Sequence, residues 1–435
     1  MTDTRDVVRR VRRELGAVSD ELAVADRTDV AHVVVIASAS RSGSSLLFHL
    51  LRSTGAFVSL DGEHSHLYRL YGLGAPVRVG AHDGCADRPT DDVADTFARE
   101  LLSDTTGSEL ARPTSVDGFA DVVVRRLAGQ WSTLLPPVDH LLPLVRRRVA
   151  AEAGQDRFDP QRLLLNVLAE LRGQGCAVNP WYYDIDADRI RAAFPGLERP
   201  SGPPVPDVVE EPPFIVPVPA RPVTMTDLSR RPLLLKASVD AYRLPLLTTL
   251  FPKADIRVVH LVRNPAATVN GLIDGWLSHG FFSYPIPPSE ATLHIDGYSH
   301  LPWGDSWWNF DLPPRWEEVR DASLPEVCAM QWAQAHDSIL TDVAGLPFPV
   351  TTVRAERMLS SFDEQRRVVA DLLAAVGAGP ATLPRPAPLV MATERPRPAR
   401  WTERHSLLAP VIRSPRVVEL ARRLDLGGPD DEGWT

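Results

Sequence analysis

Residues Val33–Ser45, with the sequence VVVIASASRSGSS, form an apolar run that ends in a small, hydroxyl-rich turn containing one arginine and one glycine. The apolar run has no polar alternation, so it predicts a parallel strand that is covered on both faces. The sequence LLFHLLRSTG follows, in which leucines recur at helical spacing and Gly55 offers a C-terminal stop. A strand, a tight turn and a helix in this order predict a cradle for a phosphate group.

The first amide groups of such a helix have no helical acceptors, and together with the helix dipole they attract an anion. Gly43 lets the backbone approach that anion closely. Compared with the nucleotide-hydrolase loop GxxxxGK[ST], Ser44 stands in place of the lysine and Ser38 in place of the first glycine. Without that lysine, the loop is poorly suited to bind ATP with magnesium. The side chains that can add contacts are those of Arg41, Ser42, Ser44 and Ser45.

Two downstream segments each predict a buried strand that delivers a basic residue. In Leu233–Phe251, LLLKASVDAYRLPLLTTLF, the apolar run ends in Lys236 and a helix follows. In Ile256–Gly271, IRVVHLVRNPAATVNG, the strand delivers Arg263, and Pro265 forces a turn because proline cannot continue a sheet.

Lysine is rare in this chain, so its positions are informative. Of the 47 lysine and arginine residues, only Lys236 and Lys253 are lysine. An ammonium is a compact charge with rotatable donors, whereas a guanidinium is a planar fork. A charge at the end of a buried strand is costly without a partner. Lys236 is therefore a candidate for contact with a bridging oxygen, with a structural ion pair as the alternative, whereas Lys253 is expected on the surface.

In this order, the three segments resemble those of sulfotransferases that use 3'-phosphoadenosine 5'-phosphosulfate, whose bacterial members often carry RSGTT in the loop. The resemblance implies that Arg263 holds the 3'-phosphate, and that Arg41 and Lys236 stabilise charge on the sulfuryl oxygens and the leaving phosphate. It assigns the 5'-phosphate to Ser42, Gly43, Ser44 and Ser45.

Two positions near the expected 3'-phosphate need comment. The serine that the family places eight residues after the arginine falls on Gly271, and Asn270 beside it is a substitute donor. Arg400 and Trp401 stand where the family often has a basic, tryptophan-containing loop over the nucleotide. A solvated basic turn is the alternative for that segment.

The segment Leu60–Leu67, LDGEHSHL, offers candidates for the base that accepts the acceptor's proton. Glu63 matches the Gly-Glu context in which tyrosylprotein and heparan sulfotransferases place a catalytic glutamate. His64 and His66 compete with it, because imidazole acts near neutral pH with little tuning; His66 is also a candidate contact to the acceptor. A polar surface turn is the plain alternative.

Six of the ten tryptophans lie between residues 276 and 332, on a segment interrupted by prolines, where little regular secondary structure is expected. Open α/β sheets bind ligands at the carboxyl ends of their strands, and this aromatic segment follows such an end directly. Trp276, Trp307 and Trp308 are therefore predicted to wall the acceptor pocket. Alternatively, they pin a long loop to the core.

The sequence predicts an α/β fold, a P-loop-type three-layer sandwich with a central parallel sheet and a mainly helical insertion. The predicted units are an N-terminal helix (1–30), the phosphate-loop half of the core (31–83), a helical and proline-rich insertion (84–231), and a second half (232–435) that holds the aromatic loop 276–316 and C-terminal helices. The insertion offers a surface for an active-site cap or a homodimer.

Net charge and cysteine usage limit the function classes. The net charge of −9 and a pI near 5.8 argue against general nucleic-acid binding. Cys85, Cys176 and Cys328 lack the spacing of a zinc site or a disulfide framework, which favours a reducing cytoplasm. No bound metal and no membrane-spanning segment are expected.

The resemblance implies in-line transfer of a sulfuryl group from 3'-phosphoadenosine 5'-phosphosulfate to a hydroxyl or amine. The product nucleotide is adenosine 3',5'-bisphosphate, and the acceptor is a small molecule, such as a bacterial specialised metabolite or glycoconjugate. One alternative is an inactive sulfotransferase-like binding or scaffold protein. The other is a P-loop phosphotransferase, which the absent loop lysine disfavours.

Overall fold

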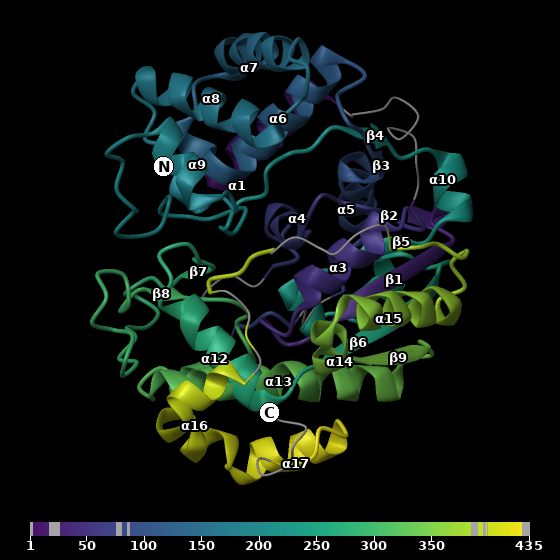
Figure 1. Ribbon diagram of the computed structural model, residues 1–435, viewed down its shortest axis with the longest axis vertical. Coiled ribbons are helices and arrows are strands. Elements are labelled where there is room, and N and C mark those ends of the chain that lie inside the picture. The colour runs from purple at the N-terminus through teal and green to yellow at the C-terminus, as the bar shows by residue number, and fades with distance from the viewer. Residues whose placement is uncertain are drawn as a thin grey trace.

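A seven-stranded sheet forms the centre of the computed structural model, which describes residues 3–16, 27–74, 81–84, 88–383, 390–394, 397 and 399–428 (Figure 1). Five neighbouring strands are parallel, as the apolar runs predicted. In spatial order the strands are β4 (Ala220–Pro222), β3 (Thr106–Glu109), β2 (Val58–Ser59), β5 (Leu233–Leu235), β1 (His32–Ala37), β6 (Asp255–Val262) and β9 (Val350–Arg354).

Alternate residues of the central strand point into two separate apolar clusters, which makes a three-layer sandwich. Val34 and Ile36 pack against the helices on one face, whereas Val33 and Val35 belong to the larger cluster on the other. The first face is covered by α3 (Ser44–Ser53), α14 (Ala355–Ser360) and α15 (Phe362–Ala375). The second is covered mainly by α5 (Asp91–Asp104), α12 (Pro265–Trp276) and α13 (Leu324–Gly345). The predicted α/β class is confirmed.

The insertion is not only helical, because it also extends the sheet. Its strands β3 and β4 pair antiparallel with each other, and β3 pairs antiparallel with β2. The proline-rich segment thus returns along the sheet edge rather than running only over the surface. The helices of the insertion after α5 are α6 (Val116–Trp131), α7 (Val138–Ala153), α8 (Pro160–Gly173) and α9 (Ala187–Ala193).

The N-terminal helix α1 (Thr4–Leu15) packs against the insertion. Arg12 donates from Nε to Glu100 at 2.6 Å and from Nη2 to Asp104 at 2.8 Å, both on α5. Burial disfavours the charged arginine, but the two carboxylates outweigh it and raise the pKa of Arg12 above its ordinary value. The predicted N-terminal helix and the insertion therefore form one packed region.

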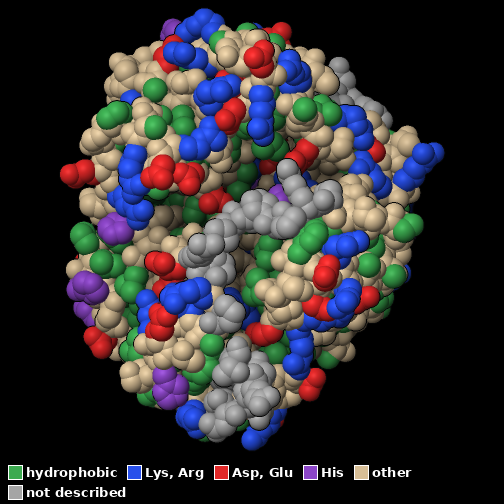
Figure 2. Space-filling model, viewed as in Figure 1, with side chains coloured by type: hydrophobic (Ala, Val, Ile, Leu, Met, Phe, Trp, Pro, Cys, Tyr) green, Lys and Arg blue, Asp and Glu red, His purple; other side chains and the backbone are tan. Residues whose placement is uncertain are grey.

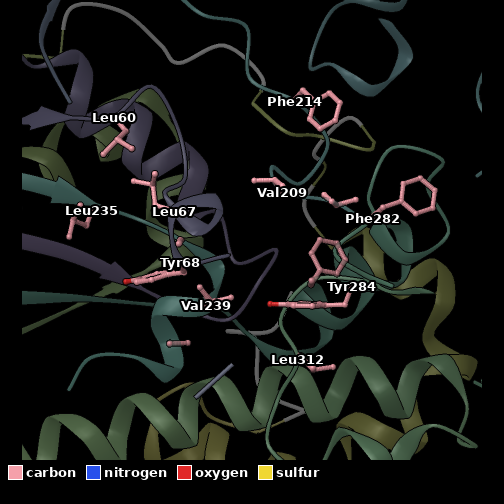
Figure 3. Close-up of a cluster of buried hydrophobic side chains, with 14 of the residues drawn as sticks. Leu60, Leu67, Tyr68, Val209, Phe214, Leu235, Val239, Phe282, Tyr284 and Leu312 are labelled. Atoms are coloured by element: carbon pink, nitrogen blue, oxygen red, sulfur yellow. The ribbon is translucent and has the colours of Figure 1, made fainter. Parts of the chain in front are cut away.

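The second half contains more regular structure than the aromatic segment suggested. Trp276 is the last residue of α12, and a small antiparallel sheet joins β7 (Tyr284–Pro285) to β8 (Trp307–Trp308). Figure 3 shows the apolar cluster beside it, where Leu67 and Tyr68 of the first half gather with Val239, Phe282 and Tyr284.

The remaining elements are short helices. They are η1 (Arg27–Asp29), α4 (Ser65–Leu70), η2 (Ser132–Leu134), η3 (Pro180–Tyr182), α10 (Met225–Arg230), η4 (Ser238–Tyr242), α11 (Leu246–Leu250), η5 (Trp316–Val319), η6 (Arg400–Arg404), α16 (His405–Ile412) and α17 (Pro415–Arg423). Among the described helices, none combines the length and apolar character that crossing a bilayer requires.

Candidate active site

Four of the candidate site segments follow directly after the carboxyl ends of four neighbouring parallel strands. Glu63 follows β2, Lys236 follows β5, the loop 38–43 follows β1, and Arg263 follows β6. The carboxyl edge of an open parallel sheet is where such folds bind ligands. Because the strands are adjacent, the four segments meet at one place although they lie between residues 38 and 263 of the sequence.

The loop after β1 has the backbone of an anion cradle. Gly43 caps α3 with φ +96°, a conformation that favours glycine, and Arg41 also has a positive φ of 64°. The first amide groups of α3 have no helical acceptors. Ser42 is fully buried, and among the described residues its hydroxyl has no hydrogen-bond partner. An unpaired buried hydroxyl beside free helix amides fits a phosphate oxygen.

Lys236 joins the first turn of α3, which follows the loop 38–43 (the phosphate loop), to the candidate base Glu63. Its ammonium donates to Ser45 Oγ at 3.1 Å and forms an ion pair with Glu63. The other carboxylate oxygen of Glu63 accepts from the amide of Ser238 at 3.1 Å. The lysine side chain is only 6% exposed, whereas Glu63 is 33% exposed. Loop, lysine and carboxylate therefore form one connected cluster that faces solvent through the glutamate.

Three arginines gather on the other side of the loop. Arg263 Nη1 donates to the carbonyl of Arg41 at 3.0 Å, and Arg400 is close enough to act on the charge of both. Burial lowers the pKa of Arg41 to about 10, and Arg263 and Arg400 add to this effect while Asp274 opposes it. A group of cations that destabilise one another when buried favours a bound dianion.

The guanidinium of Arg41 is held by the chain itself. Nη1 donates to the carbonyl of Met391 at 2.7 Å and Nη2 donates to Thr393 Oγ1 at 3.0 Å. The amide of Met391 in turn donates to Asp184 of the insertion at 3.0 Å. We refer to residues 390–394 as the strap. To contact a phosphate, this guanidinium must break its hydrogen bonds to the two strap oxygens and form new ones to the ligand's oxygens.

Gly271 on α12 lies beside Arg41. Arg41 Nε donates to the carbonyl of Gly271 at 3.3 Å. A Cβ atom on Gly271 would lie 3.4 Å from Cβ of Arg41. A side chain at this position would therefore begin at van der Waals distance from Arg41.

Asn270 is already bound to an arginine that sequence reasoning missed. Arg404 Nη1 donates to Asn270 Oδ1 at 3.0 Å and to Asp274 Oδ1 at 2.6 Å, while Arg400 pairs with the other oxygen of Asp274. Asn270 and Asp274 are four residues apart on α12, a spacing that places them on one helical face. That spacing is the sequence signal that could have pointed to this anchor. Trp401 is buried at 6% exposure and holds η6 in place.

The two histidines have buried side chains that make contacts of their own. His64 Nε2 is 3.2 Å from the hydroxyl of Tyr68 and 3.2 Å from Asp240 Oδ1. His66 is 5% exposed, and its Nε2 lies 3.8 Å from Asp104 Oδ2. Burial lowers the pKa of His66 below its ordinary value. These contacts favour Glu63 over either histidine as the base.

The three tryptophans predicted to wall the acceptor pocket have buried side chains. Trp276 and Trp308 are fully buried and pack edge to face with 5.1 Å between their ring centroids. Trp308 Nε1 donates to the carbonyl of Asp311 at 2.8 Å, and Trp307 is 6% exposed. These contacts favour the alternative interpretation, in which the tryptophans pin the segment to the core.

Asp311 in the aromatic segment is a site residue that the sequence did not reveal. It is 1% exposed, accepts from Ser40 Oγ of the phosphate loop at 2.9 Å, and accepts from the hydroxyl of Tyr242 at 2.6 Å. Burial raises the pKa of Asp311 to about 7, and nearby Asp83 acts in the same direction. The side chain thereby links the aromatic segment to the phosphate loop.

Asp311→Asn is expected to flatten the pH dependence of stability between about pH 4 and 7. A carboxyl whose pKa is raised in the folded state stabilises the fold when protonated, and this contribution is lost as the pH rises through the folded value of about 7. Each pKa unit corresponds to about 1.4 kcal/mol. Urea unfolding at pH 5 and pH 7.5 measures the effect. An equal slope in the variant would contradict a protonated Asp311, and the exposed Asp321→Asn is the control.

Comparisons with known proteins identify one distant likeness. No protein-family model matches the chain, and no curated protein is similar enough to match. Among solved structures, a sulfotransferase domain from the curacin biosynthetic pathway is similar, with a TM-score of 0.36 and 10% identity over 92% of this chain and 99% of that domain. At this level the likeness carries no argument about activity. Fold and site define an α/β protein in which a glycine-containing loop before α3 and a lysine–glutamate pair lie at one edge of the sheet.

Proposed function

We propose that this protein is a sulfotransferase that moves a sulfuryl group from 3'-phosphoadenosine 5'-phosphosulfate to a hydroxyl or amine of a small molecule. The observation that carries the proposal is Lys236, which contacts Ser45 in the first turn of α3 and Glu63 at once. A group passed from a donor phosphate to an acceptor that Glu63 deprotonates would lie between these contacts. The arginine cluster around Arg263 supports a second phosphate on the donor.

In the proposed reaction, Glu63 takes the proton of the acceptor as the acceptor's oxygen or nitrogen bonds to sulfur. The bond from sulfur to the bridging oxygen of the 5'-phosphate breaks, and its electron pair stays on that oxygen. The products are the sulfated acceptor and adenosine 3',5'-bisphosphate. Lys236 stabilises charge on the bridging oxygen, and the amides of the loop hold the 5'-phosphate. Alignment and fixed charge supply the rate enhancement.

Two groups of residues suit the two phosphates of the proposed donor. The unpaired Ser42 hydroxyl and the start of α3 suit the 5'-phosphate, and Arg263 with Arg400 suits the 3'-phosphate. Within the part of the chain that the structure describes, no group of three or more His, Cys, Asp and Glu side chains is placed to hold a metal ion. The cytoplasmic location and the homodimer remain predictions. Cys176 and Cys328 are free thiols. Cys85, the third cysteine, lies outside the described residues.

Calorimetric titration with adenosine 3',5'-bisphosphate tests the proposal. We expect binding without metal, and a loss of about tenfold or more in Arg263→Ala, because a buried charge-assisted contact is removed. Arg257→Ala on β6, the strand that precedes Arg263, is the matched control, since Arg257 pairs with Asp255 at the partly exposed start of that strand. Binding of ATP with magnesium but not of the bisphosphate would instead favour a phosphotransferase.

A further inference from the structure

A cavity of about 330 Å³ lies between α6, the end of α5 and the strands β3 and β4 at the sheet edge. Among the described residues that line it, none belongs to the cluster of Ser45, Glu63 and Lys236. A cavity of this volume, with an apolar wall and a few polar groups, is typical of small-molecule sites. The apolar wall comes from α1, α4, α6 and the segment before β4, and includes Val8, Leu70, Phe119, Val122, Val218 and Pro219.

Two neighbouring arginines of α6 line this cavity, and each has a buried N–H donor without a hydrogen-bond acceptor. Arg125 is 5% exposed; it donates to the carbonyl of Gly16 and to Ser103 Oγ at 3.3 Å, but among the described residues nothing accepts from its Nε. Arg126 Nε lies 2.8 Å from Glu210, outside hydrogen-bond geometry. Buried donors are nearly always paired, because an unpaired one has lost its water. These guanidinium groups therefore favour a ligand that carries acceptor oxygens.

The positive charge of Arg125 is only partly balanced by the protein. Asp104 accepts from Arg12 Nη2 at 2.8 Å, whereas Nη1 of Arg125 lies 3.4 Å from the same carboxylate. Arg12 also binds Glu100 at 2.6 Å, so it has two close carboxylates. Burial lowers the pKa of Arg125 below its ordinary value, and Arg12 acts in the same direction against the opposing carboxylates. A further anion beside Arg125 would therefore be stabilised.

The other carboxylates that line the cavity already have cationic partners. Asp61 pairs with Arg52 at 2.6 Å. Glu210 pairs with Arg126 and accepts from Gln130 Nε2 at 3.0 Å. Figure 2 shows that acidic and basic side chains also lie together along the hollow between the insertion helices and the core. An entering anion thus meets neutralised carboxylates and an arginine whose charge is not fully balanced.

We propose that this cavity is a second ligand site for an amphipathic monocarboxylate, whose apolar body lies against Phe119 and Val122 and whose carboxylate lies beside Arg125. A carboxylate offers two acceptor oxygens, which suit the donors of a guanidinium group. A small polar anion would leave the apolar wall without a partner, and a neutral molecule would leave the charge of Arg125 as it is. The site does not depend on the proposed function, because none of the groups proposed to hold the donor lines it.

Calorimetry on the full chain with octanoate tests this proposal, with octan-1-ol as the uncharged comparator. We expect octanoate to bind about tenfold or more tightly than octan-1-ol, and Val122→Phe to weaken octanoate by about tenfold or more because the new ring occupies the cavity. Val93→Phe is the matched control, since Val93 is a partly buried valine on α5 that does not line the cavity.

A second pair of variants tests the charge. Arg125→Met keeps an apolar side chain of similar length and should remove the preference for octanoate over octan-1-ol. Arg99→Met should keep that preference, because Arg99 is exposed on α5 and does not line the cavity. A thermal melt shows whether Arg125→Met folds. If it does not, the comparison of the two ligands and the Val122→Phe variant still decide the proposal.

Titration of octanoate in the presence of adenosine 3',5'-bisphosphate separates this site from the proposed donor site. Octanoate binding that is unchanged by bound bisphosphate supports both proposals. If the bisphosphate never binds but Val122→Phe still blocks octanoate, the cavity site stands and the sulfotransferase proposal fails. Displacement of octanoate by the bisphosphate would place it among the arginines around Arg263 and overturn the inference. Absent octanoate binding, equal affinity for octan-1-ol, or equal octanoate binding in Val122→Phe and Val93→Phe would overturn it too.

Discussion

Replacing Lys236 with alanine is expected to lower the turnover of sulfuryl transfer by about a thousandfold, because a preorganised charge beside the leaving oxygen is lost. The lysine side chain is 6% exposed and its ammonium lies 3.1 Å from Ser45 Oγ, so water cannot readily take its place. Turnover is measured as adenosine 3',5'-bisphosphate formed from the donor, with an acceptor on which the unmodified protein is active. Lys236→Arg is also expected to be slow, since the planar fork does not fit the same point.

The second lysine of the chain provides the control for this experiment. Lys253 is the only other lysine in the chain and is exposed on the turn before β6, so Lys253→Ala should leave turnover unchanged. A thermal melt checks that Lys236→Ala still folds. Full turnover by a folded Lys236→Ala variant would show that the lysine is a structural partner of Glu63 and would remove the main support for the proposed reaction.

The elements around the phosphate loop could be predicted because their signals are local. The apolar run before Ser38, the glycine at position 43 and the leucine spacing of α3 all act over a few residues. The same holds for the strands that deliver Lys236 and Arg263. Once these strands lie side by side, the sheet itself brings their ends together.

The short edge strands could not be predicted, because their pairing partners decide them. The β3 sequence TGSE and the β4 sequence ARP are polar or contain proline, and neither has the alternation of a strand. They become strands because β2 leaves an edge on which β3 adds, and β4 adds on β3 in turn. The sequence analysis therefore did not predict that the insertion pairs with the core through strands of the same sheet.

The site residues that sequence reasoning missed depend on distant partners. Asp311 binds Ser40 across 271 residues, and Arg404 binds Asp274 across 130. No spacing rule covers such distances. The same limit explains His64, whose type suggested a base but whose burial beside Tyr68 and Asp240 could only be known from the fold.

Replacing Glu63 with glutamine is expected to lower turnover by roughly 10²–10⁴-fold while adenosine 3',5'-bisphosphate binds as in the unmodified protein. Glutamine keeps the size and the hydrogen-bonding oxygen that accepts from Ser238, but it cannot take a proton from the acceptor. His64→Gln should retain turnover once corrected for folded protein, because its ring contacts Tyr68 and Asp240 instead. A reversed pattern would make the histidine the base.

The double variant Lys236→Ala with Glu63→Gln shows whether the two side chains act together. Residues that act as a unit lose activity non-additively, so the double variant should be about as slow as the slower single variant. Ser45 would then be left without its lysine contact, whereas the amides of α3 would still hold the 5'-phosphate. If the two losses multiply instead, lysine and glutamate serve separate steps, and their ion pair is only the resting arrangement of the free protein.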